Sequence, residues 1–191
     1  SSAASDVYKR QGQGEGIIEE YIQPFINQVD MIITVSQSGP GDYNIDRYAT
    51  VTRGGFNDNL NYIREELSRS IEINTSDLEW IETTLPAQFI DPPIVYNYSY
   101  RDSTGAFIAN TNGTAPPTIG EIMNKGPGGD YLSNEIFYRV AKLREEIRDT
   151  LPTGHFHISK IQSVTNDFDG NDTKDLIDIV AEGINNATTG L

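Results

Sequence analysis

Hydrophobic residues recur along the chain with two different spacings, which predict a mixture of helices and strands. Between residues 16 and 28 apolar side chains return every three or four positions, as in an amphipathic helix that buries one face. Pro24 weakens the last turns of this helix, because proline lacks the backbone N–H that a helix uses. The stretch DMIITV at 30–35 shows no polar alternation and runs into the glycine-rich SQSGPG, which is typical of a buried parallel strand that opens into a loop.

The middle of the chain is less regular and leaves alternatives open. Residues 60–72 are polar enough to form either an exposed helix or a mobile excursion. Residues 92–100 and 105–112 both favour strands, and the RDSTG between them either closes a hairpin or leads into a central strand. Residues 113–129 are rich in glycine and proline and predict a loop.

The last third again has clear periods. The helix predicted from about 133 to 149 carries one apolar stripe, with most of its charges off that stripe; the stripe consists of Ile136, Val140, Leu143 and Ile147. In HFHIS the alternation puts Phe156 and Ile158 on one face of a short strand and His155 and His157 on the other. A final helix from residue 172 closes the chain. Because helices alternate with strands, we expect an α/β fold, a three-layer α/β/α sandwich with a mostly parallel sheet.

Composition and charge limit the domain organisation, the partners and the kinds of site that we expect. The 191 residues suit a single domain, which we place at 16–191, because residues 1–15 have no hydrophobic period and resemble a non-native leader. A net charge of −14 disfavours nucleic acid and anionic membrane surfaces as partners, and the apolar runs are too short to span a bilayer. Without cysteine and with only two histidines, we expect no metal centre and no cofactor.

Ser133 is the first candidate for chemistry. It lies where the predicted helix begins, after GPGGDYL, so its oxygen would face unpaired backbone N–H groups and the positive end of the helix dipole. One interpretation is an N-cap serine, since serine is a favoured cap. The other is a nucleophile.

A nucleophilic serine needs a base and a group that orients the base. His157 is the better of the two histidines for this role, although a histidine on a strand is more often structural. His155 shares its face, but one pleat repeat of roughly 7 Å separates them, so both can hardly reach one nucleophile. Asp46, in the loop region expected after the buried strand, is the candidate acid, because ligands of α/β sheets gather beyond the carboxyl ends of strands. The alternative for Asp46 is an ordinary solvated carboxylate.

Three segments resemble, in order, the motifs of the pyroglutamyl peptidase I (pyrrolidone carboxyl peptidase) family of cysteine peptidases. SGPGDYNIDRYA at 38–49 is similar to the stretch that holds the family's acidic residue, with Asp46 at its glutamate. GDYLSN at 129–134 is similar to its G-x-YLCN stretch, with Ser133 at the cysteine. GHFHIS at 154–159 is similar to its GFIHVP-like strand, with His157 at the histidine.

Smaller similarities occur in the same order: NDN at 57–59, TLP at 84–86 and AFIANTNG at 106–113. Four departures stand beside them. The GFEPFGG-like opening of the family has no counterpart, so the domain is expected to lack its first strand. Residues near 114–128 look inserted. The arginine that the family has near the segment similar to NDN lacks a clean counterpart, and Arg53 could only substitute for it. Serine replaces the catalytic cysteine. The resemblance implies a fold of the phosphorylase/hydrolase type.

The resemblance implies a peptidase or amide hydrolase that removes pyroglutamate from a peptide with a blocked amino terminus, through Ser133, His157 and Asp46. Further expected oxyanion or substrate-binding residues are Gly129, Asp130, Asn134, Gln37 and Arg53. The alternative is a catalytically inactive relative that binds peptides or acts as an interaction domain. A homo-oligomer is compatible with either function. The resemblance implies the cytoplasm, and secretion stays open.

Overall fold

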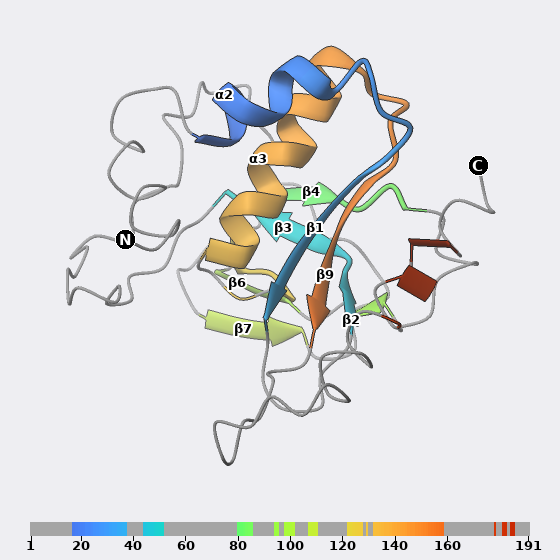
Figure 1. The fold of residues 1–191 in the computed structure, drawn as a ribbon. Coiled ribbons are helices and arrows are strands. Elements are labelled where there is room, and N and C mark those ends of the chain that lie inside the picture. The colour runs from blue at the N-terminus through green and yellow to red at the C-terminus, as the bar shows by residue number, and fades with distance from the viewer. Residues whose placement is uncertain are drawn as a thin grey trace, which may run out of the picture.

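The computed structural model describes part of the chain, and the structural statements below concern that part. The described residues are 17–37, 44–51, 80–85, 94–95, 98–101, 107–110, 122–127, 129, 132–158, 178, 181–182 and 184–185. The elements are α2 (Ile17–Ile22), η1 (Gln23–Phe25), β1 (Ile32–Gln37), β2 (Asn44–Asp46), β3 (Tyr48–Thr50), β4 (Trp80–Glu82), β5 (Ile94–Val95), β6 (Tyr98–Arg101), β7 (Phe107–Asn110), β8 (Ile122–Lys125), α3 (Leu132–Ile147) and β9 (Thr153–Ile158) (Figure 1).

The central sheet has the strand order β1-β9-β2-β5. β1 and β9 are parallel, β2 and β5 are parallel, and β2 runs antiparallel to β9, so the sheet is mixed. The α/β class and the parallel strand at 30–35 are therefore confirmed. That strand is half-buried rather than buried, and Val35 is 44% exposed. The reason is its position at one end of the strand order, where β9 is its neighbour among the described strands.

Two smaller sheets flank the central one. β3 pairs antiparallel with β4, and the third sheet has the order β7-β6-β8. The pairing of Arg101 with Phe107 confirms the hairpin predicted around RDSTG. The loop predicted over 113–129 is wrong for residues 122–125, which form β8 against β6 with a register shift. Pairing with β6 decides this conformation, because the local glycine and proline content says nothing about a distant strand.

Helix α3 covers one face of the sheets and contacts β1, β3, β4 and β9 (Figure 1). Of the predicted stripe, Val140 and Leu143 are buried and Ile136 and Ile147 are half-buried.

Burial of α3 also extends beyond the stripe. Phe137, Tyr138 and Ala141 join Ala49, Val51 and Ile81 in a core cluster. Arg144 is buried, and Arg139 and Glu135 form a buried ion pair of 3.0 Å.

Helix α2 packs across the carboxyl-terminal half of α3 (Figure 1). Ile26 is fully buried against Leu143 and Leu151, with Ile18 and Ile22 beside them. At Pro24 the α-helix gives way to the 3-10 turn η1, as the sequence predicts. Two apolar residues of this predicted amphipathic helix are not buried: the exposed fractions of Tyr21 and Phe25 are 58% and 54%.

Several expectations fall outside the described residues, namely the helix or excursion at 60–72, the leader at 1–15 and most of the last helix. Of that last helix, residues 178, 181–182 and 184–185 are helical and exposed, including Ile184 at 39%. Within the described part of the chain, every helix is too short or too polar to cross a membrane.

Candidate active site

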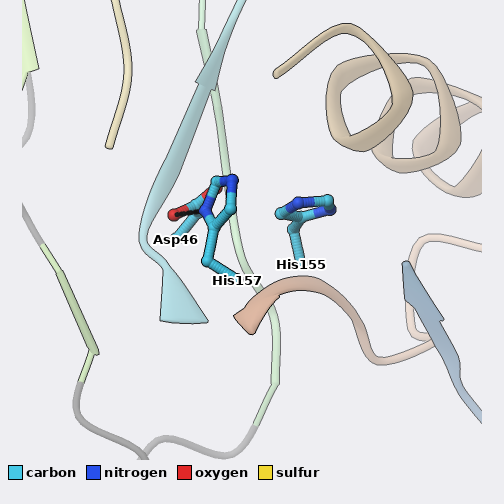
Figure 2. A group of neighbouring side chains, drawn as sticks. All are labelled: Asp46, His155 and His157. Carbon is cyan, nitrogen blue, oxygen red and sulfur yellow. Dashed lines mark hydrogen bonds and ion pairs between the residues drawn. The ribbon is translucent and has the colours of Figure 1, made fainter. Parts of the chain in front are cut away.

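The centre of the candidate site is strand β9, which is paired with β1 on one side and with β2 on the other. Its alternation follows the prediction. Phe156 packs with Ile45 and Leu85 on one face, and His155 and His157 share the opposite face. Both imidazoles are buried, with exposed fractions of 0% and 6%. Figure 2 shows the two rings side by side, with Asp46 next to His157.

Asp46 and His157 form a buried hydrogen-bonded pair. His157 Nδ1 lies 3.0 Å from Asp46 Oδ1 (Figure 2). Because a carboxylate can only accept, Nδ1 carries the proton and Nε2 is left for other chemistry. Asp46 belongs to strand β2 and is 1% exposed, so the loop position and the solvated carboxylate are both wrong. Pairing of β2 with β9 and β5 draws this residue into the sheet.

The environment of Asp46 makes its charge depend on His157. Burial raises the pKa of Asp46, while the hydrogen bond and the charge of His157 act in the opposite direction. Asp46 Oδ2 is buried and has no hydrogen-bond partner in the described part of the chain. A buried carboxylate with one unsatisfied oxygen gains from a cation beside it.

His155 has a different set of contacts. Its Nδ1 lies 2.6 Å from Thr34 Oγ1, and its Nε2 lies 2.7 Å from Ser36 Oγ. The ring stacks on Phe137 of α3 at a centroid distance of 6.1 Å and meets His157 edge to face at 4.9 Å. Burial lowers the pKa of His155 to about 3, with a smaller contribution from the charge of His157. His155 is thus neutral near physiological pH.

Ser133 lies in the first turn of α3 and is half-buried. The helix begins at Leu132, so Ser133 is a helical residue rather than the N-cap that one interpretation assigned. A spacing of four residues puts Ser133 and Phe137 on the same face of the helix. Phe137 stacks on His155, and this face is therefore the one that looks toward the two imidazoles.

The directions of α3 and β9 relate Ser133 to His157. α3 runs antiparallel to β9 (Figure 1). One helical turn from Phe137 back to Ser133 advances roughly 5.4 Å, and two strand residues from His155 to His157 advance about 6.7 Å in the same direction. Ser133 is therefore displaced from Phe137 along the helix in the same direction, and by a similar distance, as His157 is displaced from His155 along the strand. Among the described residues no hydrogen bond joins Ser133 to His157, whose described side-chain hydrogen bond goes to Asp46.

The turn before α3 uses some of the groups proposed for an oxyanion. Gly129 has φ of 85°, which favours glycine, and its N–H donates to Gly126 O at 2.9 Å. Gly126 donates in return at 2.9 Å, so the N–H of Gly129 is engaged in this turn. The side-chain amide of Asn134 holds β3, accepting from Thr50 N at 2.8 Å and donating to Thr50 O at 2.7 Å.

The structure says less about the other residues that were expected to bind the oxyanion or the substrate. Gln37 ends β1, and its backbone pairs with Ile158 at the end of β9. Asp130 and Arg53 lie outside the described residues. The sequence reasoning missed Thr34, Ser36 and Phe137. Thr34 and Ser36 carried a signal, because they are alternate polar residues that interrupt an apolar strand.

Asp46, His155 and His157 also offer atoms that could hold a metal ion, since one ligand atom from each lies within 4.8 Å of the others. Carboxylate and imidazole groups suit zinc and related ions. Both nitrogens of His155, however, are already hydrogen-bonded to hydroxyl groups. A metal ion would have to break one of these bonds, so the contacts favour a hydrogen-bonded cluster.

Comparisons with known proteins give a fold and a short sequence match. Residues 93–162 match the family described as "PA0049, C-terminal domain". An uncharacterized protein PA0049 from Pseudomonas aeruginosa is 46% identical over 43 residues, which are 22% of this chain and 8% of that protein. This match therefore covers only a small part of the length of the Pseudomonas aeruginosa protein.

Among solved structures, Pf-PCP(1-204)-C superimposes with a TM-score of 0.56 at 17% identity, covering 90% of this chain and 74% of that one. Two mutant pyrrolidone carboxyl peptidases from the hyperthermophile Pyrococcus furiosus give TM-scores of 0.55 at 18% identity, covering 90% of this chain and 76% of each. The chain therefore has a fold like that of pyrrolidone carboxyl peptidase.

Proposed function

We propose that this chain is the hydrolase domain of a serine amidase that removes an amino-terminal pyroglutamyl residue from peptides. The observation that carries the proposal is the buried hydrogen bond between His157 Nδ1 and Asp46 Oδ1 at 3.0 Å. This bond fixes the tautomer in which Nε2 can accept a proton, as an acid-base histidine requires. The fold like that of pyrrolidone carboxyl peptidase supports the substrate class.

The proposed mechanism uses three side chains of this chain. Ser133 Oγ attacks the carbonyl carbon of the pyroglutamyl bond while His157 Nε2 takes the hydroxyl proton. Asp46 holds the imidazole and stabilises the imidazolium that forms. His157 then returns the proton to the leaving amine, which breaks the C–N bond and leaves an acyl group on Ser133. Water, activated by His157, releases pyroglutamate.

The oxyanion of this reaction needs N–H donors near Ser133. First-turn backbone N–H groups of a helix have no intrahelical carbonyl partner and lie at the positive end of the dipole. Because the N–H of Gly129 donates to Gly126, we assign the oxyanion to N–H groups nearer Ser133. A second helical layer on the face away from α3, which would complete the three-layer sandwich, is part of the same proposal.

The test is hydrolysis of a pyroglutamyl-coumarin amide by the full open reading frame, with reaction of a fluorophosphonate probe in parallel. Wild type should release coumarin and take the label, and Ser133→Ala should do neither. Ser99→Ala is the matched control, because it removes a serine of β6. Loss of the label in the control instead of in Ser133→Ala would refute the assignment.

A second candidate is a relative without catalysis that binds peptide termini. The observation that favours it is that no hydrogen bond joins Ser133 to His157 in the described part of the chain. In that case wild type neither hydrolyses the amide nor takes the label, and Ser133→Cys restores turnover because a thiolate needs less help from its base. Binding of a pyroglutamyl peptide by calorimetry, without turnover, would establish this second function.

A further inference from the structure

A row of hydrogen-bonded groups runs beside the Asp46–His157 pair. Thr34 and Ser36 alternate along β1 and stand next to β9, where Thr34 pairs with His155 and Ser36 with His157. Residues that pair in a sheet point to the same face, so the two hydroxyls share the face of the two imidazoles. The contacts are 2.6 Å from Thr34 to Nδ1 of His155 and 2.7 Å from Ser36 to Nε2.

The contacts of Thr34 favour one direction for the protons of this row. Thr34 Oγ1 also lies 3.3 Å from Gly154 O, a carbonyl that can only accept. In the arrangement that uses both contacts of Thr34, its one hydroxyl proton points to Gly154 and Oγ1 accepts from His155 Nδ1–H. A neutral imidazole has one N–H, so Nε2 accepts, and it accepts from Ser36. The chain of donors runs from Ser36 to His155, from His155 to Thr34 and from Thr34 to Gly154.

This arrangement leaves His155 no place for a second proton. A proton on Nε2 would oppose the proton that Ser36 donates, and the site is fully buried. Among the described residues, the titratable groups that face His155 are His157 on its own strand and Asp46 on β2. Phe137 faces it from α3, and the hydroxyls of Thr34 and Ser36 face it from β1. These contacts are those of an imidazole that stays neutral.

We propose that His155 is a positioning residue, which Thr34 and Ser36 lock as a neutral ring so that its edge-to-face contact holds His157 against Asp46. The inference rests on the proposed function for its kinetic consequence, and its structural part can be tested without turnover. The centroids of the two rings are 4.9 Å apart at an interplanar angle of 75°. Phe137, stacked at 6.1 Å, supports His155 from the other side. A second cation at this distance would oppose the imidazolium that catalysis needs.

The first test is nuclear magnetic resonance of the imidazole nitrogens between pH 8 and pH 4.5. The chain has two histidines, so one variant assigns both sets of signals. We expect His155 to show a proton on Nδ1 and no titration. In His155→Phe the Nδ1–H proton of His157 should exchange with water about threefold faster or more, because its hydrogen bond to Asp46 is then held less firmly. A proton on Nε2 of His155, or an unchanged exchange rate at His157, would overturn the proposal.

The second test separates positioning from stability. His155→Phe keeps a ring and removes both hydrogen bonds, and Ser36→Ala removes one of them in a variant that should fold. We expect kcat to fall roughly tenfold or more in His155→Phe and less in Ser36→Ala, with KM unchanged within about twofold. Ile26→Val is the control, because it weakens the distant core around α2 without touching the site. Equal kcat in all four proteins contradicts positioning.

The outcomes of the two tests distinguish a failure of the proposed function from a failure of the positioning role. If wild type does not hydrolyse the amide, the proposed function is wrong, while the tautomer of His155 and the exchange rate of the His157 Nδ1–H proton still decide positioning. If wild type hydrolyses the amide and that exchange rate is the same with and without His155, the positioning role is wrong and the proposed function stands.

Discussion

The buried neutral state of His155 should make the stability of the protein depend on pH in a predictable way. The pKa of His155 is lowered from 6.5 to about 3 in the folded chain, mainly by burial. Below pH 6.5 the unfolded chain takes up a proton that the native chain refuses, so stability is lost as the pH falls toward 3. Well below pH 6.5 the slope approaches about 1.4 kcal/mol per pH unit, which integrates to about 2 kcal/mol between pH 6.5 and 4.5.

Asp46 has the opposite effect on how the stability of the protein depends on pH. Burial raises its pKa, so the native chain binds that proton before the unfolded chain does, and stability is gained as the pH falls through the raised pKa. The pH profile of wild type alone therefore mixes the two effects. His155→Phe removes only the histidine that stays neutral. The difference between the two profiles therefore reports mainly the contribution of His155.

The assay is urea unfolding followed by the fluorescence of Trp80, the one tryptophan of the chain. Trp80 is half-buried in β4 and meets Tyr48 edge to face at 5.5 Å, so unfolding changes its surroundings. Wild type should lose about 2 kcal/mol more than His155→Phe between pH 6.5 and 4.5, with equal m values in the two proteins. Parallel profiles over this range would refute the assignment of a neutral, buried His155.

Three further predictions concern the scaffold and are checked by thermal or urea unfolding. Gly154→Ala should destabilise by about 1–3 kcal/mol, because the new methyl group overlaps the Leu85 side chain, and full stability would mean that this strand can shift. Asn134→Ala should cost about 2 kcal/mol through two lost hydrogen bonds to β3; a loss below about 0.5 kcal/mol contradicts that role. Arg139→Met should cost about 3–5 kcal/mol by leaving buried Glu135 without this cation, and adding Glu135→Gln should recover part of it; additive losses argue against the pair.

The sequence predicted the elements that depend on local periodicity. The helix expected from about 133 is α3, the HFHIS strand is β9, and the apolar run at 30–35 is β1. Pro24 ends the regular part of α2, as its missing N–H requires. These features follow from residues within a few positions of one another, so they can be read along the chain.

Features that depend on distant partners could not be read in this way. β8 lies in a segment with loop-like composition and forms because β6 pairs with it. Asp46 was expected in a loop and is drawn into the sheet by β9. In both cases a long-range contact outweighs the local pattern. Arg144 lies off the apolar stripe and is nevertheless buried, and it donates to Asp149 O at 3.2 Å.

The features of the candidate site can be sorted in the same way, into those that local periodicity sets and those that long-range contacts set. The sequence by itself determined that Ser133 opens a helix and that His155 and His157 share one face of a strand, because helical and strand periods fix directions locally. Only the tertiary structure decided which imidazole meets the acid. Asp46 is 111 residues from His157, and Thr34 is 121 residues from His155, so strand pairing rather than spacing brings them together. That pairing also buries the cluster, and burial keeps His155 neutral.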